Sequence, residues 1–259
     1  MRRINHHFST IAQKYRDIRV TDRLHLSFIK KKLENLTEIK AVDVGCGEGR
    51  YDVKLFQYLG ERLSLTCIDP NESMLNELVK NLRDHNIRNF KPMRAQASAL
   101  PLSTNSMDSI FTFNAIHHFK LLNFLKEASR VLGNNRYLFI YTRLRSQNKR
   151  NIWGEYFPKF HEKETRLYEL SGLREELKEV PILNLEYVEY FRYRRMAKLE
   201  WLVTQAKNYH YSTFLLYDER EFEEALKKFS KNIARKYKDP DKIIWNDENI
   251  MLVIRKNVL

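Results

Sequence analysis

Short apolar runs alternate with segments of helical periodicity from Ile39 to Thr142, and this alternation dominates the hydrophobic pattern of the 259-residue chain. Runs of this kind are typical of strands buried on both faces, whereas apolar positions recurring every three to four residues indicate helices. The pattern therefore predicts a twisted parallel sheet with crossover helices on both faces. The predicted strands are Ile39–Val44, Leu63–Ile68, Asn89–Arg94, Ser109–Phe113, Arg136–Thr142, Ile182–Tyr193 and Ile250–Ile254.

The regions outside this alternation predict two helical additions. Residues 1–36 are expected to form an N-terminal helical lid, and residues 194–236 a helical cap in which Asp218 and Glu221 are spaced as a capping box. Between the fifth and sixth strands, an aromatic loop is expected at residues 153–158 and a helix at about residues 164–179. The predicted fold is α/β, with a Rossmann-like, seven-stranded, mostly parallel sheet formed by residues 37–193 plus 237–259 and the cap inserted between the last two strands.

Composition narrows the class of protein and its environment. The hydrophobic fraction of 43% and charged fraction of 31% are typical of globular domains. No apolar run approaches the roughly 18 residues of a membrane helix, and the polar N-terminal residues do not resemble a secretory signal. Only Cys46 and Cys67 occur, which is too few for a disulfide framework. We expect a cytoplasmic protein without membrane insertion and without a metal site; the sequence does not indicate its oligomeric state.

The net charge of +13 raises the question of a nucleic-acid partner. The excess of basic residues lies mostly near the two ends of the chain, in clusters such as Lys30-Lys31-Lys32 and Arg192 with Arg194 and Arg195. A solvated basic surface is the simpler interpretation. RNA binding remains a second hypothesis.

Three of the seven glycines fall within five residues, at Gly45, Gly47 and Gly49, directly after the first predicted strand. Such a loop lets the backbone approach a nucleotide-like ligand, and it directs the amide groups of the next helix toward that ligand. The second strand ends in Asp69, an acid placed to bind ribose hydroxyls. The spacing G-x-G-x-G differs from the G-x-G-x-x-G of dinucleotide sites, which disfavours a pyrophosphate.

Several segments together resemble the class I S-adenosylmethionine-dependent methyltransferases, in particular the type 11 group that includes the ubiquinone/menaquinone-biosynthesis enzymes. The segment Val42 to Gly49 resembles their motif I, and Ile68-Asp69 resembles their second-strand acid. Further matches are Ala95-Gln96-Ala97-Ser98-Ala99-Leu100-Pro101, the fourth strand with Asn114-Ala115-Ile116-His117-His118-Phe119, and Glu127-Ala128-Ser129-Arg130-Val131-Leu132. These matches cover residues 37–143.

The resemblance implies a set of residues that bind S-adenosylmethionine and its product S-adenosylhomocysteine. Asp43 would anchor the loop and the ammonium group of the ligand, and Asp69 would hold the ribose. Gln96, which replaces the usual aspartate of the family, and Ala97 would face the adenine. Asn114 and Ala115 would line the sulfonium end. The full implied set is Asp43, Gly45, Cys46, Gly47, Gly49, Asp69, Gln96, Ala97, Asn114 and Ala115.

Methyl transfer needs mainly alignment of nucleophile, methyl group and leaving sulfur, so a catalytic side chain is not obligatory. If the acceptor loses a proton, a general base is expected nearby. His117 is the first candidate, and His118, Tyr15 and His161 are the others. The resemblance implies an acceptor pocket roofed by the lid and late insertions, and the candidate acceptor residues are Tyr15, Arg19, Trp153, Phe157 and Tyr211.

Three functions follow as hypotheses. The first is a methyltransferase acting on an O, N or C atom of a small molecule. The second is an RNA (tRNA) methyltransferase that uses the basic surface and stacks a splayed base on aromatic residues. No Asn/Asp-Pro-Pro-Tyr tetrapeptide follows the fourth strand and neither cysteine is placed for a covalent pyrimidine mechanism, which favours the first. The third is a cofactor-binding protein without catalysis.

Overall fold

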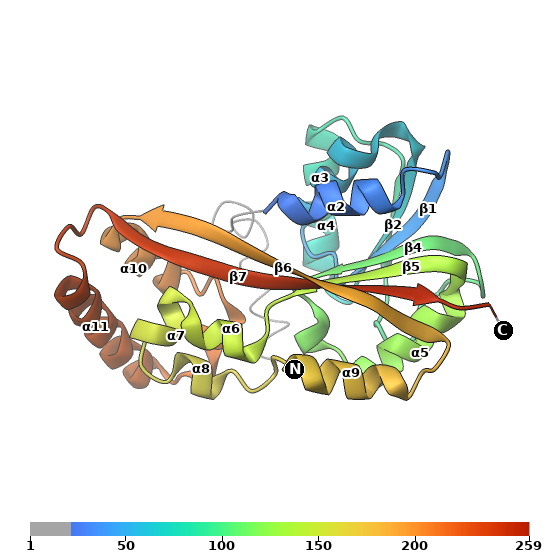
Figure 1. The fold of residues 1–259 in the computed structure, drawn as a ribbon. Helices are drawn as coiled ribbons and strands as arrows, with labels where there is room; N and C mark the ends of the chain where they lie inside the picture. The colour runs from blue at the N-terminus through green and yellow to red at the C-terminus, as the bar shows by residue number, and fades with distance from the viewer. Residues whose placement is uncertain (1–21, 259) are drawn as a thin grey trace.

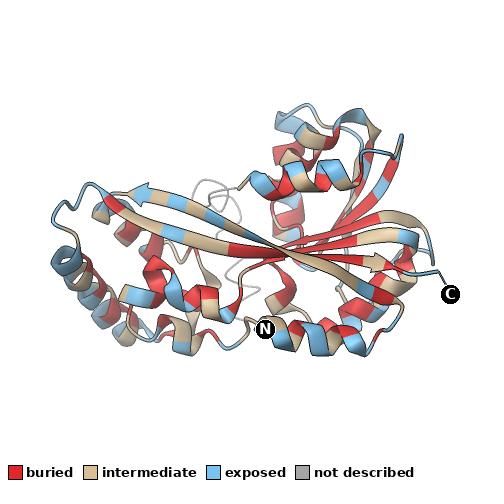
Figure 2. Ribbon diagram, in the orientation of Figure 1, coloured by how far each residue is buried: buried red, intermediate tan, exposed pale blue. Residues whose placement is uncertain are grey.

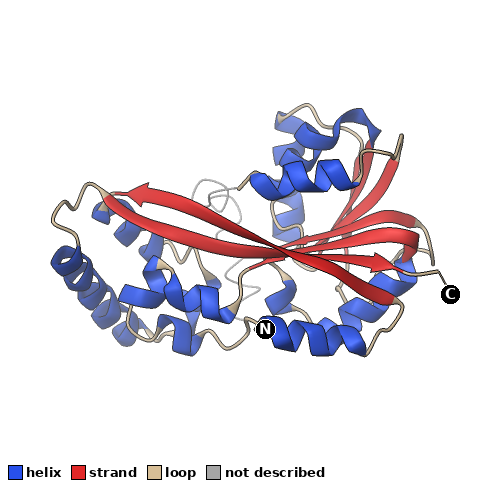
Figure 3. Cartoon of the chain, in the orientation of Figure 1, coloured by secondary structure: helices blue, strands red, loops and turns tan. Residues whose placement is uncertain are grey.

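The computed structural model describes residues 22–258, and the predicted alternation of strands and helices is present throughout residues 39–142 (Figures 1 and 3). The elements are α2 (Leu24–Lys32), β1 (Ile39–Val44), α3 (Arg50–Leu59), η1 (Gly60–Arg62), β2 (Leu63–Asp69), α4 (Glu72–Asp84), β3 (Phe90–Arg94), β4 (Met107–Phe113), η2 (Ile116–His118), α5 (Leu121–Val131), β5 (Leu132–Thr142), α6 (Arg145–Arg150), α7 (Ile152–Tyr156), α8 (Phe160–Lys163), α9 (Leu170–Lys178), β6 (Leu183–Ala197), α10 (Leu199–Lys207), η3 (Ser212–Leu216), α11 (Glu219–Lys236) and β7 (Ile243–Lys256).

The sheet has seven strands in the order β3-β2-β1-β4-β5-β7-β6. Strands β1 to β5 are parallel to one another, whereas β7 runs antiparallel to both β5 and β6. The order reverses between β1 and β4, and in such sheets ligands bind outside the carboxyl ends of the strands at this switch point. The predicted α/β fold, a mostly parallel seven-stranded sheet with a helical insertion between the last two strands, is confirmed.

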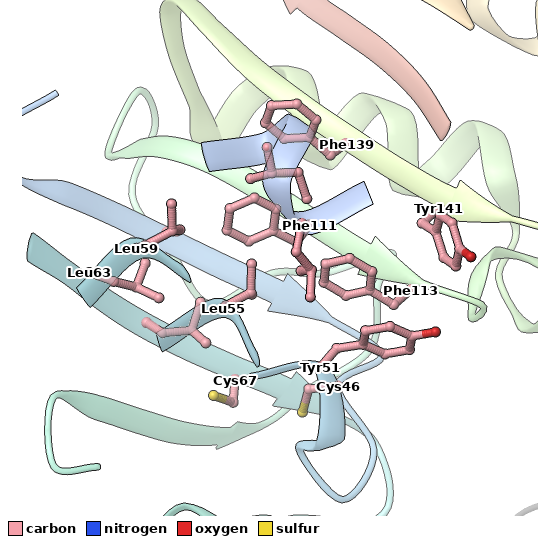
Figure 4. Close-up of a cluster of buried hydrophobic side chains, with 14 of the residues drawn as sticks. Cys46, Tyr51, Leu55, Leu59, Leu63, Cys67, Phe111, Phe113, Phe139 and Tyr141 are labelled. Carbon is pink, nitrogen blue, oxygen red and sulfur yellow. The ribbon is translucent and has the colours of Figure 1, made fainter. Parts of the chain in front are cut away.

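Side chains of alternating strand positions build two separate cores, one on each face of the sheet. The strands in the middle of the sheet are largely buried (Figure 2). Ala41 packs with α2, α3 and α4 on one face, and the next residue, Val42, packs with α5 and α9 on the other. Figure 4 shows the first core, where Phe111 and Phe139 stack with ring centroids 5.7 Å apart. Helices on both faces explain why the central strands are continuously apolar.

Strands β6 and β7 extend beyond the rest of the sheet. β5 pairs with β7 only from Ile250 to Arg255, so the segment Ile243–Asn249 pairs with β6 alone, opposite Phe191–Ala197. We call these two segments the arm; it projects from the sheet and carries α10, η3 and α11 at its far end (Figure 1). These helices pack with α7 and α8 around a third core that contains Trp153, Phe214 and Phe229.

Four local predictions between β5 and the C-terminus are wrong. Strand β6 ends at Ala197, four residues after the predicted Tyr193 and inside the predicted cap, because it pairs with β7 along the arm. The predicted aromatic loop is helix α7, because the Asn151 side chain caps it by accepting from the Gly154 amide at 2.7 Å. The helix predicted from residue 164 begins at Leu170, since the Glu164 carboxylate instead binds Arg166 and Thr213. Strand β7 begins seven residues before the predicted Ile250, at Ile243.

The structure describes only part of the predicted lid but all of the predicted cap. Most of the predicted lid, residues 1–21, lies outside the described residues, and α2 is the described part of that region. Asp218 caps α11 as predicted, accepting from the Glu221 amide at 2.8 Å. Among residues 22–258, no helix is long and apolar enough to cross a membrane.

Candidate active site

A cavity of about 900 Å³ opens at the carboxyl ends of β1, β2 and β4 and continues between the sheet, the arm and the cap helices. This volume lies at the upper end of the usual range for small-molecule sites. Nine of the ten residues implied for the cofactor line it: Asp43, Gly45, Cys46, Gly47, Asp69, Gln96, Ala97, Asn114 and Ala115. The cavity therefore brings together side chains and backbone from separate strands at the switch point between β1 and β4.

The glycine loop follows β1 and has a left-handed backbone at all three glycines. A Cβ added at Gly45 would lie 2.6 Å from the Ala115 Cβ, so only glycine fits where the loop crosses the end of β4. Gly47 lines the cavity, and a Cβ added there would meet nothing within 4 Å. The loop thus leaves open space at Gly47 for a ligand. Gly49 instead packs against Leu78 and lets α3 approach α4.

Asp69 ends β2 and is held between the glycine loop and the start of α4. Its Oδ2 accepts the Gly47 amide at 3.1 Å, and its Oδ1 accepts the Asn71 amide at 2.8 Å. Burial raises the pKa of Asp69 to about 6, while these two backbone hydrogen bonds oppose the rise. Each carboxylate oxygen still has a second lone pair, so the ribose role implied for Asp69 fits its position.

A pair of buried carboxyl groups lies beneath the glycine loop. Asp43 at the end of β1 and Asp52 in the first turn of α3 lie close enough for each carboxyl group to affect the pKa of the other. Burial raises the pKa of Asp43 well above its usual range and that of Asp52 to about 7. A shared proton is the expected state near neutral pH, because two adjacent carboxylates repel each other. Burial also raises the pKa of the Cys46 and Cys67 thiols, which therefore stay protonated.

The loop after β3, which carries Gln96 and Ala97, is fixed from behind by α5. The Glu127 carboxylate accepts the Leu100 amide at 2.6 Å, and Arg130 donates to the carbonyls of Leu100 and Leu102. Arg130 also forms an ion pair with Glu127 at 2.8 Å. The helix segment that resembles the family thus serves the site indirectly, by holding the loop that lines the cavity.

Asn114 follows β4 with a left-handed backbone, φ 53°, and its side chain is bound at both ends. Its Nδ2 donates to the Tyr51 hydroxyl at 3.2 Å, and its Oδ1 accepts from Asn249 Nδ2 at 3.2 Å. Because Asn249 belongs to the arm, the arm directly positions a residue at the implied sulfonium end. Tyr51 and Asn249 also line the cavity, and we did not predict either residue from the sequence.

His117 and His118 both line the cavity next to Asn114. Burial, with a smaller effect of Arg166, lowers the pKa of His118 to about 4, so this imidazole is neutral at pH 7. The two rings lie 4.0 Å apart between centroids. His161 is remote from this group and contacts Glu162 and the Gly154 carbonyl.

The acceptor predictions divide into three outcomes. Trp153 and Tyr211 line the cavity. Phe157 is packed into the third core, with its ring 5.1 Å from that of Phe214. Tyr15 and Arg19 lie outside the described residues.

Several polar cavity residues of the arm were not predicted, among them Asp247 and Asn249. The run Trp245-Asn246-Asp247-Glu248-Asn249 resembles a loop by its polarity, which concealed the strand. Its alternation was the available signal: Trp245, Asp247 and Asn249 line the cavity, whereas Asn246 is exposed.

Proteins similar in sequence to this chain include methyltransferases. The family described as a methyltransferase domain matches residues 41–135. The ubiquinone/menaquinone biosynthesis C-methyltransferase UbiE of Rickettsia prowazekii is 34% identical over 139 residues, which cover 50% of this chain and 56% of that protein. The chain thus spans about half the length of the curated relatives it matches.

Solved structures extend the likeness to the fold. The YcgJ protein of Bacillus subtilis has a TM-score of 0.64 at 14% identity, over 90% of this chain and 98% of its own. Phosphoethanolamine N-methyltransferase 2 of Haemonchus contortus, solved with phosphomonomethylethanolamine and S-adenosylhomocysteine, has a TM-score of 0.55 at 14% identity, over 91% and 53%. Residues 41–135 thus match a family of methyltransferase domains, and the chain as a whole shares the fold of these solved structures.

Proposed function

We propose that this protein transfers a methyl group from S-adenosylmethionine to a small-molecule acceptor. The observation that carries the proposal is the single cavity, which runs from the glycine loop and Asp69 past Asn114 to Trp153 and Tyr211. Donor and acceptor would therefore meet without crossing solvent. The similarity of residues 41–135 to methyltransferase domains and the small-molecule role named for UbiE support the same function.

The residues present fit S-adenosylmethionine in shape and charge. Gly47 leaves open space in the cavity, and Asp43, Glu48 and Asp69 supply carboxyl groups on the side implied for a ligand with ammonium and sulfonium charges. Asp69 would bind the ribose hydroxyls, and Gln96 and Ala97 would border the adenine. The bound donor supplies an already activated methyl group.

The chain's own contribution would be alignment and exclusion of water. Asn114, fixed by Tyr51 and Asn249, would set the position of the sulfonium end. Transfer to an O–H, N–H or C–H group breaks the carbon–sulfur bond, forms the bond to the acceptor and releases one proton. We assign the uptake of that proton to His117, which lines the cavity beside Asn114.

The free, buried cysteines are compatible with a reducing compartment such as the cytoplasm.

The decisive experiment is incubation of the purified protein with methyl-labelled S-adenosylmethionine and a cell extract separated into small molecules and RNA. Label in the small-molecule fraction supports the proposal. Label in RNA alone would replace it with the RNA methyltransferase hypothesis, and label in neither fraction, despite cofactor binding, would favour a non-catalytic binding protein.

Substitution of Asp69 tests the donor half separately. Asp69→Ala should weaken S-adenosylhomocysteine binding about 100-fold, because a buried carboxylate that binds ribose and the loop is lost. Isothermal titration calorimetry measures the affinity, and circular dichroism establishes that the variant is folded. Asp84→Ala, an aspartate at the far end of α4, is the matched control and should bind normally. Equal affinities of both variants would contradict the role assigned to Asp69.

A further inference from the structure

We call the part of the cavity lined by Arg143, Trp153, Tyr211 and Asp247 the acceptor side. There Asp247 lies between two arginines. Its Oδ1 is 3.2 Å from Arg143 Nη2, and its Oδ2 is 3.2 Å from Arg195 Nε. Arg195 forms a second ion pair with Asp22, whose carboxylate also accepts from the Tyr141 hydroxyl at 3.1 Å. The two arginines and two aspartates all line the cavity, so their charges balance within its wall.

The arm explains why these groups face the cavity together. Asp247 pairs with Tyr193 and Trp245 pairs with Arg195 across the arm, and paired residues of antiparallel strands project from the same face. Arg143 follows β5 and is held by the Glu248 carbonyl and the Tyr211 hydroxyl. The side chains are little exposed, 10% for Arg143 and 14% for Asp247, so water screens them weakly.

The other charged groups on this side have partners or are exposed. Glu164 lines the cavity and forms an ion pair with Arg166 at 2.5 Å. Lys198 pairs with Asp241 at 3.4 Å on the surface, and Lys120 is exposed. His118 is neutral at pH 7. The inner wall on the acceptor side therefore has no net charge, and Trp153, Tyr211 and Trp245 give it large aromatic surfaces.

We propose that this compartment selects an acceptor that is uncharged where it contacts the arm, and that Asp247 determines this selectivity. The inference rests on the proposed methyltransferase function and extends it to the class of acceptor. An anionic acceptor would have to displace Asp247 from Arg143 and Arg195, and it would lose its own hydration without gaining a free cation. A cationic acceptor would lie beside two arginines and would be repelled.

Three small aromatic probes of similar size test the proposal: phenol is uncharged, benzoate is an anion and benzylammonium is a cation at pH 7. Their binding to the protein saturated with S-adenosylhomocysteine is measured by ligand-observed NMR titration. Phenol should bind about tenfold more tightly than either ion. Equal or tighter binding of benzoate or benzylammonium would overturn the inference, as would failure of phenol to bind the saturated protein.

Neutralising Asp247 should reverse the discrimination against anions. Asp247→Asn keeps the size of the side chain and removes the ion pair of Arg143, while Arg195 keeps its ion pair with Asp22. Benzoate affinity should therefore rise about tenfold while phenol affinity changes little. Asp241→Asn, which neutralises the surface partner of Lys198, is the matched control and should leave benzoate binding unchanged. An unchanged benzoate affinity in folded Asp247→Asn would overturn the inference.

Arg143→Gln provides a second variant with the opposite sign. It leaves Asp247 with one arginine partner, so benzylammonium affinity should rise several-fold.

Labelled transfer to extract fractions separates this inference from the proposed function. Label in small molecules that ion exchangers do not retain supports both. Label only in retained, charged small molecules would overturn the acceptor class and leave the methyltransferase function intact.

Discussion

The donor side and the acceptor side of one cavity are built in different ways. Donor residues lie at the ends of consecutive parallel strands, where three left-handed glycines and Asp69 define the site mainly through backbone geometry. Acceptor residues come from distant segments, including Arg143 after β5 and Asp247 on the arm, and they are held by side-chain ion pairs. The comparison teaches that a fixed donor site can be joined to an acceptor site whose chemistry depends on a few long-range contacts.

Gly45→Ala is the strongest test of the backbone-defined donor side. The new Cβ would lie 2.6 Å from the Ala115 Cβ on a left-handed backbone, so the loop must move. S-adenosylhomocysteine affinity should fall about 100-fold by calorimetry. Gly172→Ala, in α9 with open space around it, is the control and should bind normally. A Gly45→Ala protein with nearly normal affinity would show that the loop tolerates displacement.

Gly154→Ala introduces a similar steric clash in α7, which packs in the third core next to the acceptor side. A Cβ on α7 would lie 2.0 Å from the Asn148 carbonyl oxygen, which must move away. The free energy of unfolding should fall by about 3 kcal/mol, as measured by urea denaturation. Hydrogen exchange should accelerate in α7, α10 and α11 while β1 to β4 stay protected. Uniform acceleration in both regions would mean that the third core does not unfold separately.

The pH dependence of stability in Asp52→Asn tests the donor side alone, because the carboxyl pair of Asp43 and Asp52 lies beneath the glycine loop. Folding raises the pKa of Asp52 from 3.8 to about 7, so the folded protein retains a proton that the unfolded chain releases. The stability from this group is complete below about pH 4 and is lost as pH rises through 7. The variant should therefore gain about 4 kcal/mol at pH 8 and almost nothing at pH 4. Thermal denaturation at both pH values measures it; equal gains would contradict the assignment.

The smallest effects come from matched helix caps on the two sides. Asn71 caps α4 and Asp218 caps α11, each by accepting a hydrogen bond from the backbone three residues later. Substitution of either by alanine should cost about 1 kcal/mol of stability. Asn71 lines the cavity, and its cap holds in place the backbone N–H that donates to Asp69, so Asn71→Ala alone should weaken S-adenosylhomocysteine binding, by about threefold. Equal affinities in the two variants would show that the donor side does not depend on this cap.

The same contrast explains what the sequence could predict. Glycine spacing and the acid after β2 are local signals with a strong physical cause, so nine implied cofactor residues were found at the cavity. Asp247 and Asn249 could not be found in this way, since their partners Arg143 and Asn114 are more than a hundred residues away in the chain. Phe157 illustrates the opposite difficulty: an aromatic residue in a predicted lid can as easily belong to the core of that lid.

The tip of the arm suggests how the two sides can change independently. Ala197 and Ile243 pair with each other there, so the chain leaves the sheet for the cap and returns at a single point. Residues 198–242 supply none of the residues implied for the cofactor, all of which lie between Asp43 and Ala115. If the proposed function holds, insertion, shortening or exchange of that segment between related genes would change the acceptor, while the residues proposed to hold the methyl donor would be inherited unaltered.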